Sequence, residues 1–258
     1  TLKKQILADA MRIMGPDSSG ASAARNSLAA TYRDAGRLNE AITLYEENLD
    51  DVTRTLGLDH SETLASRHCL AGAYRDAGRL DEAIPLFEQN LTDFTRIAGP
   101  DHPETLASRA TLAGAYRDAG RLDEAIPLFE QNLDNVARVL GLDHPETLAS
   151  RHSLASAYRE AGRLDEAIPL FEQNLTDFIR ILGPDRPDTF TSRSTLAGAY
   201  QAASRLDDAI TLHRQTLEDR TRTLGPAHPV TLISRGNLAN AYLAAGRAEE
   251  AKKLFEAP

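Results

Sequence analysis

The sequence contains a single cysteine, Cys69, among its 258 residues. One cysteine cannot form an intramolecular disulfide or supply a zinc site built from several thiolates, which excludes a secreted disulfide scaffold. No apolar run approaches the roughly 20 residues of a membrane-spanning helix, and no basic start leads into an apolar signal segment. These absences predict a cytoplasmic protein that has no membrane partner.

An excess of basic residues is also missing. The sequence has 29 Lys and Arg residues against 38 Asp and Glu residues, so its formal net charge is −9. Proteins hold nucleic acid by neutralising phosphates with a basic surface, so we expect no nucleic-acid partner. Tryptophan is absent and 41% of the residues are hydrophobic, which is typical of a helical chain rich in Ala and Leu.

Enzyme motifs are absent as well. The sequence has no Gly-x-x-x-x-Gly-Lys-Ser/Thr phosphate loop, no His-Glu-x-x-His zinc motif and no Gly-x-Ser-x-Gly elbow. Four histidines share one register, but neighbouring helices lie about 10 Å apart, too far for bonds of about 2 Å to one metal. We therefore expect no enzyme, no cofactor and no metal site, and we interpret these histidines as loop residues beside helix caps: His60, His102, His144 and His228.

A 42-residue repeat runs through the chain. One tyrosine and one turn glycine return at this interval, and Ser204 occupies the remaining glycine position. A fixed period of this length is typical of stacked supersecondary units, each too small to bury its own apolar face. The repeated tyrosines are Tyr32, Tyr74, Tyr116, Tyr158, Tyr200 and Tyr242.

Each repeat is predicted to form two helices, because its apolar residues recur at helical spacing. In the third repeat, Asp101 is the predicted cap of the first helix, Pro103 fits its first turn and Glu104 completes a capping box. This helix is expected to end at Gly120. The second is expected to run over residues 122–141 and to end at a glycine suited to the left-handed conformation.

The repeat divides the chain into a single predicted domain over residues 1–258. Neither end has the polar cap expected of a natural end to such an array, so we expect a piece of a longer protein. The predicted segments are a half-helix of a preceding repeat (1–14), complete repeats at 17–58, 59–100, 101–142, 143–184 and 185–226, and a truncated last repeat (227–258).

Two motifs recur in nearly every repeat: Leu112-Ala113-x-x-Tyr116 in the first helix and Ala125-x-x-x-Phe129 in the second. With them the sequence resembles the tetratricopeptide repeat (TPR) family, in the long-period form found in kinesin light chains and many bacterial regulators. HEAT repeats suit the period but lack this pattern.

The sequence departs from the common family pattern in three ways. Arg109 and its equivalents replace the usual Trp, Asn132 replaces a small residue, and the period exceeds the common one of about 34 residues. We interpret the arginines as architectural, with an apolar stem and a head that meets a carboxylate. They are Arg25, Arg67, Arg109, Arg151, Arg193 and Arg235.

The resemblance implies an all-α fold, a right-handed α-solenoid of stacked antiparallel helix pairs whose inner helices line a concave groove. It implies a module that binds a protein or peptide, similar to the sensor arrays of bacterial signalling NTPases of the STAND class. The alternative is a scaffold that assembles with copies of itself through its terminal helices or convex side, and so forms a homo-oligomer without a dedicated peptide ligand.

A row of arginines marks the turn end of the inner helices. Arginine in a concave surface can hold a carboxylate or phosphate with two hydrogen bonds, which favours an acidic ligand. An acidic residue follows each arginine, however, so the row also fits a solvated ladder in which each arginine pairs with the next repeat. Both interpretations stay open for Arg33, Arg75, Arg117 and Arg159.

Four more residues complete the predicted peptide-binding groove. His68 and His152 stand at a groove position that varies between repeats. Asn237 and Asn240 occur only in the last inner helix, and the resemblance implies that asparagines there hold the main chain of a ligand. Glycines in mid-helix cost about 1 kcal/mol each relative to alanine, which suggests close approach of a ligand backbone or of a neighbouring helix; they are Gly72, Gly114 and Gly198.

Overall fold

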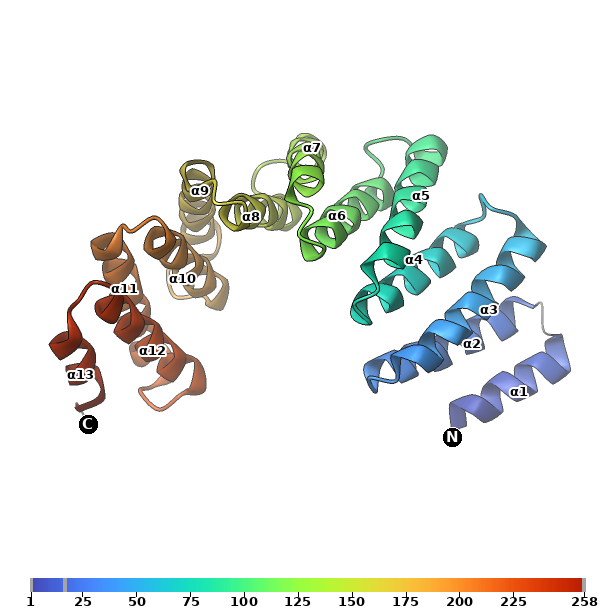
Figure 1. Ribbon diagram of the computed structural model, residues 1–258, viewed down its shortest axis with the longest axis horizontal. Coiled ribbons are helices and arrows are strands. Elements are labelled where there is room, and N and C mark those ends of the chain that lie inside the picture. Colours follow the sequence, from blue (N-terminus) through green and yellow to red (C-terminus); the bar gives the residue numbers. More distant parts are fainter. Residues whose placement is uncertain (1, 16–17, 257–258) are drawn as a thin grey trace. The chain divides into compact units, whose positions relative to one another are not determined.

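The computed structural model describes residues 2–15 and 18–256, and within these ranges every regular element is an α-helix. Short turns join the helices in antiparallel pairs (Figure 1). The helices are α1 (Leu2–Met14), α2 (Ser19–Asp34), α3 (Leu38–Leu56), α4 (Ser61–Asp76), α5 (Leu80–Ala98), α6 (Pro103–Asp118), α7 (Leu122–Leu140), α8 (Pro145–Glu160), α9 (Leu164–Leu182), α10 (Pro187–Ala202), α11 (Leu206–Leu224), α12 (Pro229–Ala244) and α13 (Ala248–Glu256).

The chain divides into two compact units, residues 1–132 and residues 133–258. In the N-terminal unit, each helix from α1 to α6 packs against the next one along the chain. The same is true from α8 to α13 in the C-terminal unit. This confirms the predicted all-α architecture of stacked helix pairs. We call the first helix of each repeat, α2 to α12 in even numbers, an inner helix, and its partner an outer helix.

The turn from an inner to an outer helix requires a left-handed backbone. Gly162 has φ +74°, and the residue at the same position of the next repeat, Ser204, has φ +58°. Ser204 keeps the turn although a side chain makes this conformation costly, by roughly 1 kcal/mol. None of the helices in the described residues combines the length and apolar character needed to cross a membrane.

Histidine caps most of the inner helices. The residue before α8 is His144, whose Nδ1 accepts a hydrogen bond from the backbone N–H of Glu146 at 3.2 Å. In the third repeat the predicted cap, Asp101, is wrong: His102 is the N-cap, and Pro103 begins the helix as expected. The recurrent histidines therefore serve as the caps themselves. The described residues contain no cluster of three or more His, Cys, Asp or Glu side chains that could hold a metal.

A buried polar network explains why this chain departs from the usual repeat pattern. Arg67 is 2% exposed, and its Nη1 donates to Asn90 Oδ1 at 3.1 Å and to Asp93 Oδ2 at 2.7 Å. The Asn90 amide donates in turn to the backbone oxygen of Leu64 at 3.0 Å. Arginine and asparagine thus replace Trp and a small residue together, as partners. Arginine–aspartate pairs recur in three other repeats: Arg25 with Asp51, Arg151 with Asp177, and Arg193 with Asp219.

The third repeat lacks the carboxylate of this network. Its sequence has Asn135 where the second and fourth repeats have Asp93 and Asp177. Arg109 is 3% exposed, and its Nη1 has no hydrogen-bond partner among the described residues. Burial without that charge lowers the pKa of the Arg109 guanidinium. In four repeats the buried arginine pairs with an aspartate, as the architectural interpretation predicts. In the third repeat the sequence has no aspartate at that position.

One outer helix carries a histidine where the other repeats have an aromatic ring. His213 of α11 is 3% exposed, and its Nε2 lies 3.1 Å from Gln201 Oε1. Burial lowers the pKa of this imidazole below its ordinary value. The corresponding residues are Tyr45, Phe87, Phe129 and Phe171.

Replacing His213 with phenylalanine is expected to remove an acid-sensitive element of the fold. In the native state burial disfavours the protonated ring and lowers its pKa, whereas in the unfolded chain the ring takes up a proton at its ordinary pKa of about 6.5. The contribution of His213 to the free energy of unfolding is therefore fully present above this pH and is lost as the pH falls below it. Between about pH 7.5 and about pH 5.5, the wild type should lose more thermal stability than His213→Phe. Parallel melting curves that fall by the same amount would contradict this assignment.

Candidate functional site

The candidate site is the inner-helix face, which we define as the exposed and half-buried side chains of the inner helices together with the outer-helix side chains that border them. In the C-terminal unit it carries Ala149, His152 and Arg159 on α8 and Thr191 and Gly198 on α10, and it continues on α12. Small and polar residues predominate there. The predicted site residues divide between the two units.

Arginines of the N-terminal unit are engaged by the next repeat. Arg33 Nε lies 2.6 Å from Asp76 Oδ2, and Arg75 Nε lies 2.6 Å from Asp118 Oδ2. The side chains are about one-third to two-fifths exposed, so each pair contributes at most about 1 kcal/mol. For these two arginines the structure agrees with the ladder interpretation, and their charge is matched within the chain.

The ladder stops in the fourth repeat. The residue that would pair with Arg159 is Ala202, and Arg159 has no ion pair among the described residues. Its guanidinium instead lies over the Phe171 ring, 5.9 Å from the centroid, and the side chain is half-buried. Arg117, the remaining member of the row, has its Nη2 3.6 Å from Asp118 Oδ1 on its own helix. Arg159 therefore presents an uncompensated positive charge on the inner-helix face.

The two predicted histidines occupy the same place in different units. His68 meets the Phe87 ring edge-on at a centroid distance of 5.6 Å, and His152 meets Phe171 at the same distance. Partial burial and the charge of Arg33 lower the pKa of His68. His152 also lines a pocket and lies seven residues before Arg159, which places the two about 10 Å apart along α8.

The asparagines of the last inner helix have unused hydrogen-bonding groups. Asn237 is half-buried and Asn240 is exposed on α12, and neither amide makes a side-chain hydrogen bond within the described residues. Each amide can both donate and accept, which is what an extended backbone requires. Two apolar side chains on the same helix, Ile233 and Leu243, are 58% and 56% exposed beside them.

Intrachain packing does not require the mid-helix glycines. A Cβ at Gly72 would meet Arg33 Nη1 at 3.6 Å, and one at Gly114 would meet the Arg75 guanidinium at 3.8 Å, both ordinary contacts. A Cβ at Gly198 would meet nothing within 4 Å. Because Gly198 has open space beside it, tight packing of inner helices does not account for it, and close approach of a ligand stays the explanation to test.

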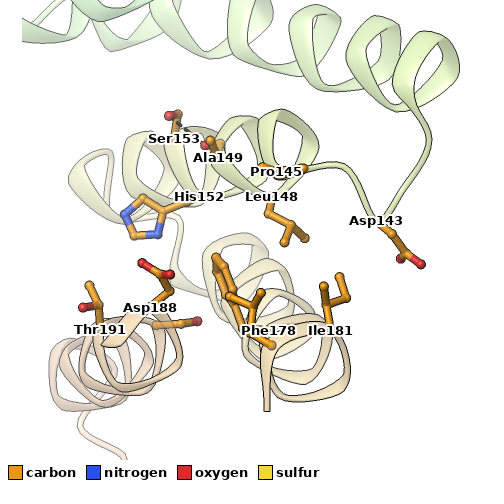
Figure 2. Close-up of a pocket in the computed structure, with 12 residues that line it drawn as sticks. Asp143, Pro145, Leu148, Ala149, His152, Ser153, Phe178, Ile181, Asp188 and Thr191 are labelled. Atoms are coloured by element: carbon orange, nitrogen blue, oxygen red, sulfur yellow. Dashed lines mark hydrogen bonds between the residues drawn. The ribbon is translucent and has the colours of Figure 1, made fainter. Parts of the chain in front are cut away.

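A pocket of about 590 Å³ opens between α8, α9 and α10 in the C-terminal unit. Figure 2 shows Leu148 pointing from α8 toward Phe178 and Ile181 of α9, while His152 and Asp188 face each other at one side. Sequence reasoning named only His152 of this set. No sequence pattern pointed to the others, and Ile181, an apolar residue at the end of α9, is 39% exposed in the structure.

A search of curated proteins gives no match to this chain. The tetratricopeptide repeat family profile matches in five overlapping windows: residues 20–89, 62–133, 110–176, 152–218 and 188–257. Together these windows cover nearly the whole chain. The matched region includes every inner helix described above.

Many solved structures are similar to the chain, and they include the following three. One from Podosopora anserina, described as kinesin light chain with nearly identical TPR-like repeats, is 36% identical and covers 78% of this chain and 95% of that one (TM-score 0.73). The second is a STAND protein with a tetratricopeptide repeat sensor from Pyrococcus horikoshii, 14% identical, covering 98% of this chain and 37% of that one (TM-score 0.74). A Rap protein complexed with Competence and Sporulation Factor is 11% identical and covers 92% of this chain and 74% of that one (TM-score 0.58).

Proposed function

Because the chain belongs to the tetratricopeptide repeat family, we propose that it binds a protein segment on its inner-helix face, mainly in the C-terminal unit. The family fold is that of a protein–protein interaction module, and its members are generally non-catalytic scaffolds. We propose no enzymatic activity, cofactor or metal for this chain.

One observation supports the C-terminal unit as the binding region. Arg33 and Arg75 are neutralised by aspartates of the next repeat, whereas Arg159, Asn237 and Asn240 have no such partners in the described residues. Polar groups without intrachain partners are available to a ligand without first breaking a bond. Asn237 and Asn240 would bind the ligand backbone, and Arg159 would bind a carboxylate.

We extend the proposal to a wider setting, in which the array is the sensor of a larger cytoplasmic signalling protein. The likeness to the STAND protein's repeat sensor supports this by analogy alone, since identity is 14%. The sequence of the parent gene tests it. A nucleotide-binding domain encoded before Thr1 is expected, and an unrelated neighbouring domain would reject the sensor role while leaving ligand binding intact.

The binding proposal predicts a specific loss of affinity. A random peptide library displayed on phage is selected on the full chain, and the best peptide is synthesised and titrated by fluorescence anisotropy. The double substitution Asn237→Ala and Asn240→Ala should weaken binding of this peptide by about 10-fold or more. Two hydrogen bonds to the peptide backbone, worth roughly 1 kcal/mol each, are lost. Asn39→Ala on α3 is the matched control and should leave affinity unchanged.

Two results would reject the proposal. One is a selection that enriches no peptide at all. The other is a peptide whose affinity is the same for the wild type, the double variant and the Asn39→Ala control.

Self-association is a second candidate, favoured by the apolar surface of α1. Leu2, Ile6 and Ile13 of this helix are 77%, 48% and 72% exposed. Burial of such side chains stabilises contacts between chains. Light scattering at rising protein concentration should show a dimer that dissociates when Ile6 and Ile13 are replaced with serine, and a monomer at all concentrations would exclude this candidate.

A further inference from the structure

The pocket on the inner-helix face of the C-terminal unit combines an apolar interior with a charged side. Leu148 of α8 and Phe178 and Ile181 of α9 form the apolar walls, and Ala149 leaves space above them (Figure 2). The volume of about 590 Å³ falls within the range of pockets that hold small ligands or large side chains. A bulky apolar side chain is the group that gains most from entering it.

The charge at this pocket is negative. Asp143 is already matched, because Arg180 Nη1 donates to its Oδ2 at 2.9 Å. Asp188 is exposed in the first turn of α10 and has no ion pair among the described residues. The start of a helix favours a negative charge at this position. An uncompensated acid beside an apolar cavity attracts a cation attached to an apolar group.

We infer that this pocket receives a bulky aliphatic or aromatic side chain of the bound segment, with a Lys or Arg next to it that pairs with Asp188. The inference rests on the proposed function, because it specifies the ligand of the same inner-helix face. The ligand therefore carries positive charge at the pocket and negative charge where Arg159 lies, about 10 Å along α8. An extended segment of three or four residues spans that length.

The test uses the same phage library, selected in parallel on the full wild-type chain and on two pocket variants. Ala149→Trp fills the pocket, and Asp188→Lys reverses its charge. Both positions are exposed, so the fold is retained, which circular dichroism verifies. The matched controls occupy the same repeat positions in the N-terminal unit, Ala65→Trp and Glu62→Lys.

Wild-type selection should enrich peptides in which Leu, Ile, Phe or Trp adjoins Lys or Arg. Their affinity should fall at least 10-fold with Ala149→Trp and with Asp188→Lys, and stay unchanged in both controls. Enriched peptides that lack this pairing, or that bind the pocket variants as well as the wild type, overturn the inference and leave the proposed function standing. A selection that enriches nothing overturns both.

Discussion

Replacing Arg151 with alanine is expected to lower the free energy of unfolding by about 3 kcal/mol or more. Arg151 is 3% exposed, and its Nη1 donates to Asn174 Oδ1 at 3.0 Å and to Asp177 Oδ2 at 2.7 Å. Alanine removes the buried stem and leaves Asn174 Oδ1 and Asp177 Oδ2 without this donor in a region of low dielectric, while Arg180 still donates to Asp177 Oδ1 at 2.9 Å. Urea denaturation followed by circular dichroism measures the loss.

Two further variants distinguish the stability lost with the buried ion pair from the stability lost through a change in helix propensity. Arg159→Ala makes the same change on the same helix at a position without an ion pair, and it should shift the midpoint only slightly. The double substitution Arg151→Met and Asp177→Leu removes both charges and replaces them with apolar volume, so it should be less destabilising than Arg151→Ala alone. An Arg151→Ala midpoint equal to that of Arg159→Ala would contradict the role assigned to the network.

Reversing the charge of Arg159 is expected to weaken binding of the library-selected peptide by about 10-fold to 100-fold. A hydrogen bond to a charged group contributes roughly 1.5–3 kcal/mol, and Arg159→Glu also places a repulsive charge before the ligand carboxylate. The matched change at Arg75 disturbs a residue already paired with Asp118, so it should alter affinity less than about threefold. Anisotropy titrations of both variants give the comparison.

The outcome at these two positions also decides between interpretations of the arginine row. Equal losses at Arg75 and Arg159 would mean that the whole row binds ligand and that the ladder opens to admit it. No loss at either position would remove arginine from the binding surface and leave Asn237 and Asn240 as its polar contacts.

The helices could be predicted closely from the sequence, because tyrosine, glycine and apolar residues repeat at one period. The third repeat was expected to contain helices that end at Gly120 and begin near residue 122, and α6 and α7 follow this closely. The cap was missed because histidine is not among the residues usually favoured there, whereas Asp101 is. Here His102 has its Nδ1 2.6 Å from Glu104 Oε2, a pairing that the capping box does not include.

Less of the candidate site could be predicted, because it depends on which side chains pair with one another. The sequence placed four arginines in one row, but only the structure shows Arg33 and Arg75 bound to the next repeat and Arg159 without an acid. The single signal for this difference was Ala202, which replaces the expected acidic residue. The pocket was beyond prediction, since it arises where the ends of three helices leave space.

The buried network has a consequence for how such a gene can change length. Arg67 finds Asn90 and Asp93 inside its own repeat, and Arg151 finds Asn174 and Asp177 in the same way. Recombination between near-identical stretches of DNA can therefore delete or duplicate one whole repeat, because the buried arginine and its acidic partner are lost or gained together. An indel of another size within residues 67–93 or 151–177 shifts the acid relative to its guanidinium and is expected to destabilise that repeat, so changes by complete periods are the ones that preserve the network.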